Sequence, residues 1–519
     1  MCAIAGVIGG ELSMRDSLLD KLLCSMVHRG PDETGFFSSD YKPISIGMNR
    51  LSITGIHDLN RCPYVSDGLV LSFNGEIYNY RELKSSLQRE KAEVFETQTD
   101  TEVLLKLWKH YGEKCLNKLN GMFAFAIYDT KKNLLYLARD IAGQKPLYYY
   151  KSNHQQIIFA SEAKAIYNAL PNLEFVDGES LRFYEAFQHN LTGTLFKNLN
   201  QVAAASIMKI DCETFNFEVK PYWEPTFEVA ANVNVDAREA QFEHLLIESV
   251  KRITACEVPY GIYLSKGVDS QVINALGNFD KTFYFDRDEE WSDDFYKNFN
   301  KISQILDFPV GSLSSYPLFK LAEKASANGV KVVVSGEGSD EILGGYVRYL
   351  PISSLDDIYN NFPSYKRLFD KALGFRELQF AKISCRNDDI EFVLSIVEEC
   401  RAKTPDMLSC MQYFDFKYVL PSLLQMGDRM ASNFSLENRC PFLDRDLIEY
   451  SFSLPKVNKI SHFDQKIILR RLAHKLGVET EKEKTGLTIK FNVYMHRNDW
   501  NRDNYFSNLN YEWLLGIRR

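Results

Sequence analysis

The chain has 519 residues and a formal net charge of −8, with 45% hydrophobic and 25% charged side chains, as in an ordinary soluble globular protein. It has no basic excess for nucleic acid or an anionic membrane, and no apolar run long enough to span a bilayer, so we expect neither partner. The ten cysteines form no C-x-x-C pair, which argues against a zinc site or a dense disulfide framework. With no secretory signal pattern at the start, we expect a cytoplasmic protein with reduced thiols.

Residues 2–215 are predicted to form one domain of short antiparallel strands with a few helices. Apolar or aromatic segments at 134–138, 146–150 and 157–160 are separated by polar turns, which is typical of antiparallel pairing. A capping pattern begins an apolar run at 99–112 and predicts a helix there.

A stiff stretch with two prolines predicts a linker over 216–236, and 237–519 is predicted to be a second domain. Two buried strand candidates, 261–264 and 330–334, each run into a polar, glycine-bearing loop and then a helical segment. This alternation predicts a parallel α/β sheet, closed by a mostly helical part from about residue 350.

Cys2 is a candidate nucleophile. Initiator methionine is readily trimmed before a small residue, which would leave Cys2 with a thiol and a free α-amine. The ordinary pKa of such an amine, about 7.7–8.0, leaves a useful fraction neutral at pH 7. The amine could take the thiol's proton, so that one residue acts as both nucleophile and base. The alternative is an ordinary small residue after the start codon.

Polar clusters downstream could form a substrate site around this thiol. Arg50 lies at a predicted strand edge and suits a bidentate grip on a carboxylate. Asn74 supplies an amide beside Gly75, whose backbone can approach a ligand closely, and the pair could donate two hydrogen bonds to an oxyanion. Asp100 adds an anion for a substrate ammonium. Taken singly, each has a structural alternative: a solvated arginine, an Asn-Gly turn and a helix cap.

Two loops in the second half have the residue types of a nucleotide site. The loop 265–270 follows a predicted strand and begins a predicted helix, where backbone N–H groups and hydroxyls form an anion site. Asp269 in it could bind a Mg²⁺ ion that bridges phosphates. It matches neither a Walker motif nor a dinucleotide fingerprint, and a plain helix cap is the alternative. The loop 335–346 places three acids among four glycines after an apolar strand, which suits a ligand crevice at a strand's carboxyl end.

The first half resembles the class II glutamine amidotransferase domain, an N-terminal-nucleophile hydrolase with an αββα sandwich. The matching motifs, in order, are CAIAG (2–6), HRGPD (28–32), RLSI (50–53), FNGEIYN (73–79), DTE (100–102), GMFAF (121–125), RD (139–140), GQKPLY (143–148) and ASE (160–162). The resemblance implies that Cys2 attacks the side-chain amide of glutamine and releases ammonia, with Asn74 and Gly75 as the oxyanion hole. Arg50 would bind the glutamine α-carboxylate, and Glu76 and Asp100 would bind its α-amine.

Over the whole chain, the resemblance extends to the glutamine-hydrolysing asparagine synthetases, whose second domain is a synthetase of the ATP pyrophosphatase type. The matching motifs are SKGVDS (265–270), SGEGSDEILGGY (335–346) with RY (348–349), DRM (428–430), SLENRCPFLD (435–444) and KIILR (466–470). Related enzymes that form β-lactams or amidate sugar carboxylates share this plan.

The family chemistry is adenylation of a carboxylate by Mg-ATP, loss of pyrophosphate, and attack of ammonia on the acyl-adenylate. By resemblance, Asp269 and Asp340 would bind Mg²⁺, Glu337 would help to deprotonate ammonia at the acyl centre, and Lys484 would stabilise charge on the phosphates or the tetrahedral intermediate. The implied ligands of ATP and pyrophosphate are Leu264, Ser265, Gly267, Asp269, Ser270, Ser335, Gly336 and Arg429.

Several positions leave the function open. The family loop has glycine where this chain has Lys266, which would be strained if the position needs φ > 0, or would reach a phosphate instead. The aromatic and acidic stretch 283–290 matches the family poorly where nucleotide and acceptor are recognised. Lys466 and Arg429 have a structural alternative as surface charges or ion-pair partners.

The leading hypothesis is an ATP-dependent amidotransferase that converts aspartate to asparagine with glutamine as nitrogen donor. One alternative is the same chemistry on another carboxylate, such as a sugar uronate. A second alternative is a glutaminase or regulatory pseudoenzyme whose synthetase loop is disabled by Lys266. The expected partners are small-molecule substrates, and assembly as a homodimer is left open.

Overall fold

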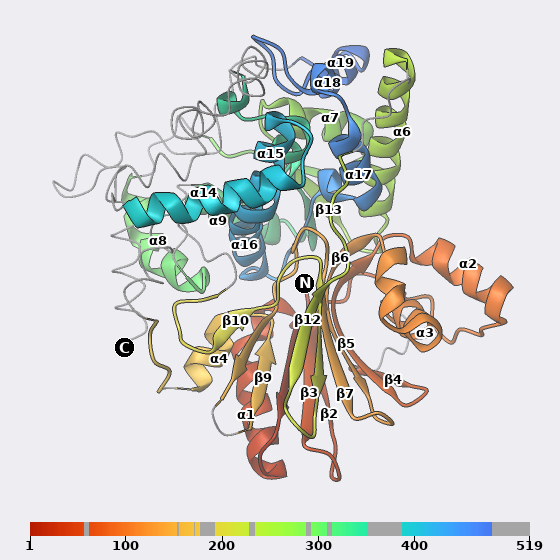
Figure 1. The fold of residues 1–519 in the computed structure, drawn as a ribbon, viewed down its shortest axis with the longest axis vertical. Helices are drawn as coiled ribbons and strands as arrows, with labels where there is room; N and C mark the ends of the chain where they lie inside the picture. Colours follow the sequence, from red (N-terminus) through yellow and green to blue (C-terminus); the bar gives the residue numbers. More distant parts are fainter. Residues whose placement is uncertain are drawn as a thin grey trace.

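The computed structural model describes residues 1–56, 62–152, 155–170, 172–176, 193–227, 234–286, 292–308, 314–350 and 387–479. Within these ranges the chain forms two units (Figure 1). The sandwich unit, up to residue 221, holds two antiparallel sheets, and the parallel-sheet unit, from residue 235, holds a parallel sheet. The chain begins where the two units meet, and Met1 packs among residues of the parallel-sheet unit.

Two six-stranded antiparallel sheets make up the sandwich unit. The strand order of the first is β10 (Leu199–Gln201), β8 (Tyr148–Lys151), β9 (Ile157–Ala160), β1 (Ala3–Ile8), β3 (Ile44–Arg50) and β2 (Glu33–Ser38). The order of the second is β12 (Phe217–Pro221), β11 (Ser206–Asp211), β7 (Leu134–Arg139), β6 (Gly121–Asp129), β5 (Leu69–Ile77) and β4 (Tyr64–Ser66).

The two sheets pack face to face, and helices cover their outer faces. Along β1, Ile4 and Ile8 belong to the core between the sheets, whereas Ala5 and Val7 pack under helices, which is the period-two alternation of a strand. The covering helices are α1 (Leu12–Ser25) and α4 (Ala163–Ala169) on the first sheet, and α2 (Tyr80–Lys91) and α3 (Asp100–Tyr111) on the second. The predicted αββα sandwich is therefore confirmed.

The sheet of the second unit is parallel throughout, in the order β14 (Lys281–Phe283), β13 (Tyr260–Tyr263), β15 (Val332–Val334) and β16 (Glu437–Arg439). The chain runs from β13 outward to β14 and then crosses to β15 on the other side of β13. This makes the carboxyl ends of β13 and β15 a topological switch point, the usual ligand crevice of such sheets. The predicted loops 265–270 and 335–346 follow β13 and β15 directly.

Helices surround the parallel sheet, and α18 and α19 lie at the end of the molecule away from the sandwich unit (Figure 1). The α-helices are α6 (Val235–Thr254), α7 (Val268–Leu276), α8 (Ser292–Ile305), α9 (Ser315–Ala327), α10 (Ser339–Leu343), α14 (Asn387–Ala402), α15 (Met407–Phe414), α16 (Leu420–Ser432), α17 (Arg445–Ser453), α18 (Lys456–Lys459) and α19 (Ile467–Lys475). Short 3-10 or π turns are η1 (Val27–Arg29), η2 (Gly112–Lys118), η3 (Val347–Tyr349), η4 (Asp415–Val419) and η5 (Pro441–Leu443).

The predicted local elements agree with the structure to within a few residues. The helix predicted at 99–112 is α3, and the Thr99 side chain caps it by accepting from the backbone N–H of Glu102. The segment 216–236, predicted as a linker, contains β12, which pairs with β11, and the first residues of α6. The second sheet of the sandwich therefore continues into that segment.

Candidate active sites

Cys2 lies just before β1, at the junction of the two units. Its backbone N–H donates to Asn74 Oδ1 at 3.1 Å, and its carbonyl oxygen accepts from Arg29 Nε at 3.0 Å. Burial raises the pKa of the thiol, while the backbone N–H of Leu51 hydrogen-bonds to the sulfur and opposes that rise. Hydrogen bonds thus hold the backbone of Cys2 at both its N–H and its carbonyl oxygen, and the backbone N–H of Leu51 lies beside its thiol.

Asn74 and Gly75 are adjacent in β5 and lie beside Cys2. Asn74 is fully buried, and its Nδ2 has no hydrogen-bond partner within the described residues. A buried donor without a partner is costly and is expected where a ligand completes it. At Gly75 a Cβ atom would lie 2.1 Å from the Met122 carbonyl oxygen, so only glycine fits against β6. The pair has the chemistry of the predicted oxyanion hole.

Arg50, Glu76 and Asp100, the predicted ligands of the glutamine α-groups, lie around the same site. Arg50 ends β3 and donates to the Thr54 and Gly55 carbonyl oxygens at 3.3 Å each. The Thr54 hydroxyl in turn donates to Glu76 Oε2 at 3.3 Å. Asp100 accepts from the backbone N–H of Ile77 at 2.9 Å. Arg50 and Glu76 are thus linked through Thr54, and Asp100 binds the backbone of the residue that follows Glu76.

Of the two carboxyl groups of this site, Asp100 is buried and Glu76 is half-buried, and removal from water raises the pKa of both. The pKa of Glu76 is about 8, with Asp100 and Glu437 also raising it and Arg439 lowering it. The pKa of Asp100 is about 6, where the backbone N–H groups of Ile77 and Thr101 oppose the effect of burial. A substrate ammonium would favour ionisation of both carboxyls.

The loop after β13 closes on itself through its own side chains. Ser265 Oγ and Ser270 Oγ lie 3.0 Å apart, and Ser265 Oγ accepts from the backbone N–H of Gly267 at 3.2 Å. Leu264 before it is buried, and its backbone N–H bonds to the Phe283 carbonyl oxygen. The loop that is predicted to bind phosphate therefore lies at the amino end of α7.

The acidic loop after β15 lies against that phosphate loop. A Cβ atom at Gly336 would come within 2.9 Å of Asp269 Cβ, so glycine lets the two loops approach closely. The preceding Ser335 is buried, with its hydroxyl 3.5 Å from Cys440 Sγ. The carboxyl ends of β13 and β15 thus bring the predicted phosphate ligands together.

Lys466 joins the two predicted magnesium ligands. Its Nζ lies 2.6 Å from Asp269 Oδ1 and 2.7 Å from Asp340 Oδ1, and it also donates to Ser339 Oγ at 2.8 Å. A Cβ atom at Gly345 would lie 2.0 Å from Lys466 Cε, so this glycine makes room for the lysine. The two carboxylates converge on one point, which fits a metal held by two carboxylates and substrate phosphates.

Glu337 is half-buried and lies against Gly427 of α16. Its Oε2 accepts from Asn438 Nδ2 at 3.3 Å and lies 3.6 Å from Cys440 Sγ. Burial raises the pKa of Glu337 to about 7, although both of these hydrogen bonds lower it. A carboxyl that titrates near neutral pH suits general base chemistry.

Arg429 does not join the phosphate ligands and is withdrawn from that predicted set. It is completely buried at the boundary of the two units, where it donates to Asp307 Oδ2 at 2.9 Å and 2.5 Å and to Asp428 Oδ2 at 2.5 Å. Asp428 also binds Arg29, at 2.8 Å and 3.1 Å. Two carboxylates of its own unit occupy the Arg429 guanidinium, which also lies 3.9 Å from Glu162 Oε1 of the sandwich unit, so its role here is that of a buried ion-pair partner at the boundary.

Lys266 is exposed and takes an ordinary backbone conformation. The described non-glycine residues with positive φ do not include it, and Gly267 has φ −72°. The strain considered for a lysine at this position therefore does not arise. Lys484, predicted to stabilise charge during amide formation, lies outside the described residues.

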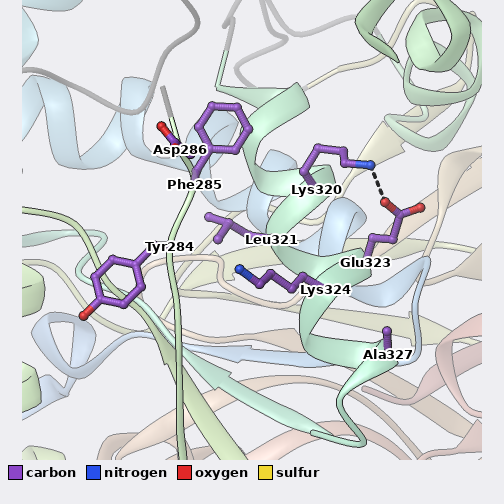
Figure 2. Close-up of a pocket in the computed structure, with 8 residues that line it drawn as sticks. All are labelled: Tyr284, Phe285, Asp286, Lys320, Leu321, Glu323, Lys324 and Ala327. Atoms are coloured by element: carbon purple, nitrogen blue, oxygen red, sulfur yellow. Dashed lines mark hydrogen bonds and ion pairs between the residues drawn. The ribbon is translucent and has the colours of Figure 1, made fainter. Parts of the chain in front are cut away.

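A pocket lies beyond the carboxyl end of β14, where the sequence departs from the family pattern. Its lining residues are Tyr284, Phe285, Asp286, Lys320, Leu321, Glu323, Lys324 and Ala327. Figure 2 shows Tyr284 and Phe285 on one side and the lysines of α9 on the other, with Lys320 paired to Glu323. This pocket combines aromatic rings and charges beside the strand next to the phosphate loop.

Arg439, Asn438 and Cys440 contact site residues, although sequence reasoning assigned them no role. They belong to the motif at 435–444, which the resemblance singled out without a chemical reason. Arg439 Nη2 lies 3.1 Å from Glu76 Oε1, a contact between residues far apart in the chain. A buried-strand position that carries an arginine was the available signal, because buried charges need partners.

Two family models match the chain: a glutamine amidotransferase domain at residues 1–223 and asparagine synthase at residues 289–482. A putative glutamine-hydrolysing asparagine synthetase 2 of Methanocaldococcus jannaschii is 30% identical, over 73% of this chain and 81% of that protein. The chain belongs to the glutamine-hydrolysing asparagine synthetase family.

Other members of the asparagine synthetase family cover more of the chain. Asparagine synthetase 1 of Bacillus subtilis is 28% identical over 97% of this chain and 89% of its own length. A putative asparagine synthetase of Mycobacterium tuberculosis H37Rv is 29% identical over 91% and 83%. Members of this family are ligases that use glutamine and ATP as substrates. No helix in the described part of the chain is long and apolar enough to cross a membrane.

Proposed function

We propose that this protein hydrolyses glutamine at Cys2 and passes the ammonia to an adenylated carboxylate, with aspartate as the acceptor and asparagine as the product. The observation that carries the first half is the unpaired Nδ2 of buried Asn74 next to Cys2. The converging Asp269 and Asp340 carboxylates support the second half. The names of the relatives support aspartate as the acceptor.

At the glutamine site, the Cys2 thiolate attacks the side-chain carbonyl carbon of glutamine. The oxyanion accepts from Asn74 Nδ2 and the Gly75 N–H, ammonia leaves, and water hydrolyses the thioester to glutamate. Arg50 binds the substrate α-carboxylate, and Glu76 and Asp100 bind its ammonium. A free amine on Cys2, exposed by removal of Met1, serves as the base.

At the synthetase site, the acceptor carboxylate attacks the α-phosphorus of ATP and pyrophosphate leaves. The serine hydroxyls and the backbone N–H groups at the start of α7 bind the phosphates. Mg²⁺ held by Asp269 and Asp340 supplies charge neutralisation of the phosphates when bound. Glu337 takes a proton from ammonia as its nitrogen attacks the acyl carbon, and AMP leaves. A cytoplasmic location accords with the free thiols of the described cysteines.

Pyrophosphate release identifies the acceptor. The full-length protein is incubated with Mg-ATP, ammonia and one candidate acid at a time, and pyrophosphate and the amide product are measured. Release that depends on aspartate and yields asparagine supports the proposal. Release with a sugar uronate or another acid, but not with aspartate, would show that the acceptor is not aspartate. The aromatic pocket at Tyr284 and Phe285 is a reason to include larger acids in the test. No release with any acid would contradict the synthetase assignment.

A further inference from the structure

Strand β16 lies between the two sites and contacts both. Its three residues, Glu437, Asn438 and Arg439, are all buried. Successive side chains of a strand point to opposite faces, so Glu437 and Arg439 share one face and Asn438 takes the other. The first face meets the sandwich unit at Glu76, and the second meets Glu337.

Arg439 is anchored at two of its nitrogens and reaches the glutamine site with the third. Nε donates to Glu437 Oε1 at 2.8 Å, and Nη1 donates to the Ile253 carbonyl oxygen at 2.7 Å. Nη2 lies 3.1 Å from Glu76 Oε1 without hydrogen-bond geometry to any described residue. The contact with Glu76 is therefore electrostatic, and the bond to Glu437 ties the guanidinium to β16.

Glu76 is the carboxylate proposed to receive the substrate ammonium, and its charged surroundings are mostly acidic. Asp100 and Glu437 face it and disfavour its ionisation, while Arg439 favours it. Loss of Arg439 would leave three carboxyl groups close together with less compensating charge. An uncompensated buried carboxyl takes up a proton and no longer attracts an ammonium.

The opposite face of β16 positions the acyl-site carboxylate. Asn438 Nδ2 donates to Glu337 Oε2 at 3.3 Å, and Cys440 lies 3.6 Å from the same oxygen. The backbone of β16 is also tied to the Glu337 loop, since the N–H of Ser335 donates to the Arg439 carbonyl oxygen at 3.0 Å. A displacement of Arg439 therefore bears directly on the strand that holds Glu337.

We propose that Arg439 is a positioning residue that completes the glutamine site from the parallel-sheet unit and couples that site to the acyl site through β16. This inference rests on the proposed glutaminase activity. The glutamine ammonium and the Arg439 guanidinium share Glu76, so glutamine binding shifts the guanidinium, and Asn438 carries the shift to Glu337. Such a coupling is reciprocal, so occupancy of the synthetase site changes the affinity for glutamine by the same factor.

The first test is steady-state glutaminase kinetics on the full-length protein, with Arg439→Met and Arg439→Lys. The expected result is a glutamine KM raised about tenfold or more by Arg439→Met, with a smaller change in kcat and partial recovery in Arg439→Lys. Arg252→Met is the matched control, because Arg252 also pairs with carboxylates in the parallel-sheet unit, at 2.7 Å from Asp444, but contacts neither site.

A double-mutant cycle with Glu76→Gln isolates the contact. Without the Glu76 charge, Arg439→Met should change the glutamine KM by less than about twofold. An unchanged KM in Arg439→Met or Arg439→Lys, in a parent that hydrolyses glutamine, would overturn the inference. A parent that forms no glutamate contradicts the proposed function instead, so the two failures are distinct.

The second test measures the coupling itself, by calorimetry of glutamine binding in the Cys2→Ala background, where glutamine persists. Mg-ATP with the acceptor acid should change the glutamine Kd by about fivefold or more, and Arg439→Met should reduce this factor to near one. A factor that Arg439→Met leaves intact would show that the sites communicate by another route. If Arg439→Met fails to fold, Arg439→Lys decides, because it keeps the charge but shortens its reach to Glu76.

Discussion

The glutamine site and the phosphate site differ in how far their polar groups are satisfied before substrate arrives. At the first, buried Asn74 keeps a donor without a partner in the described structure. At the second, Lys466 already pairs with both Asp269 and Asp340, and the serine hydroxyls of the loop bond to each other. The oxyanion donor of the first site can receive its ligand as it stands, whereas the second site must exchange internal contacts for those of ATP. Preorganised donors favour the transition state because they need no reorganisation.

The largest effect is expected from a variant that abolishes the reaction at the glutamine site and leaves the reaction at the phosphate site intact. Cys2→Ala removes the nucleophile, so glutamine-dependent amide formation should fall by about 10³-fold or more. Ammonia-dependent formation should persist, since no described contact joins the thiol to the phosphate loop. Both rates are followed by amide product in the same preparation. Loss of both would contradict the two-site comparison.

Because the oxyanion hole is preorganised, removal of one of its hydrogen-bond donors should cause a large loss of glutaminase activity. Asn74→Ala should lower the glutaminase kcat by about 10²–10³-fold, with a smaller change in the glutamine KM. Glutamate formation under saturating glutamine measures it, and ammonia-dependent activity of the same variant reports its folding. A loss confined to KM would assign Asn74 to ground-state binding.

The internally satisfied site predicts an effect on stability. Lys466→Met leaves Asp269 and Asp340 uncompensated, so the free energy of unfolding should drop by about 3 kcal/mol. Mg²⁺ should then raise Tm more in the variant than in the parent, because the metal replaces the lost charge. Lys475→Met is the control on the same helix: Lys475 is 66% exposed in its pair with Glu243, and its loss should cost less than about 1 kcal/mol. An equal response to Mg²⁺ in variant and parent would argue against a metal between these carboxylates.

The raised pKa values at the glutamine site predict that glutamine binding strengthens with pH. Binding of an ammonium needs ionised carboxylates, and Glu76, with a pKa of about 8, is mostly protonated below that pH. Between pH 6.5 and 8 the glutamine affinity should rise about 16-fold, because the ionised fraction of such a carboxyl rises by that factor. Asp100, with a pKa of about 6, contributes at the lower end. Calorimetry in the Cys2→Ala variant measures this, and a flat profile would exclude Glu76 as the ammonium ligand.

The smallest effect is expected at Lys266. Because its backbone is unstrained, Lys266→Gly should not stabilise the protein, and the free energy of unfolding should change by less than about 0.5 kcal/mol. The KM for ATP should change only a few-fold, measured by pyrophosphate release. A large gain in synthetase activity would revive the pseudoenzyme hypothesis, in which this lysine disables the loop.

More of the contacts at the glutamine site than at the phosphate site could be predicted from the sequence, for a physical reason. Cys2, Asn74 and Gly75 act through backbone geometry and short side chains, and their motifs are local. The antiparallel strands and the parallel sheet followed from periodicity and α3 from capping, whereas the αββα sandwich followed from the family resemblance. Lys466 and Arg439 act through partners nearly 200 and more than 300 residues away, and only the folded chain brings them together.

Arg429 and Lys266 show two other limits of the sequence. An arginine beside a site motif can bind a phosphate or a carboxylate, and only the burial of Arg429 between Asp307 and Asp428 shows that it binds the carboxylates. A lysine at a position where the family has glycine indicates backbone strain only when φ is positive there, and the residue type alone does not determine φ. Both positions carry long charged side chains, whose reach leaves their partners undetermined by the sequence.

Because Met1 is buried in the folded protein, it must be removed before folding is complete. Met1 is 1% exposed, its sulfur accepts from Arg29 Nη2 at 3.1 Å, and its amine lies 3.9 Å from Glu437 Oε2. Once the chain has folded, no aminopeptidase can reach the bond to Cys2. Trimming must therefore take place before the ribosome has synthesised the residues around Glu437, roughly 20–90 s at ordinary elongation rates. A molecule that misses this interval would use free ammonia but not glutamine, and mass spectrometry of the amino terminus would count such molecules.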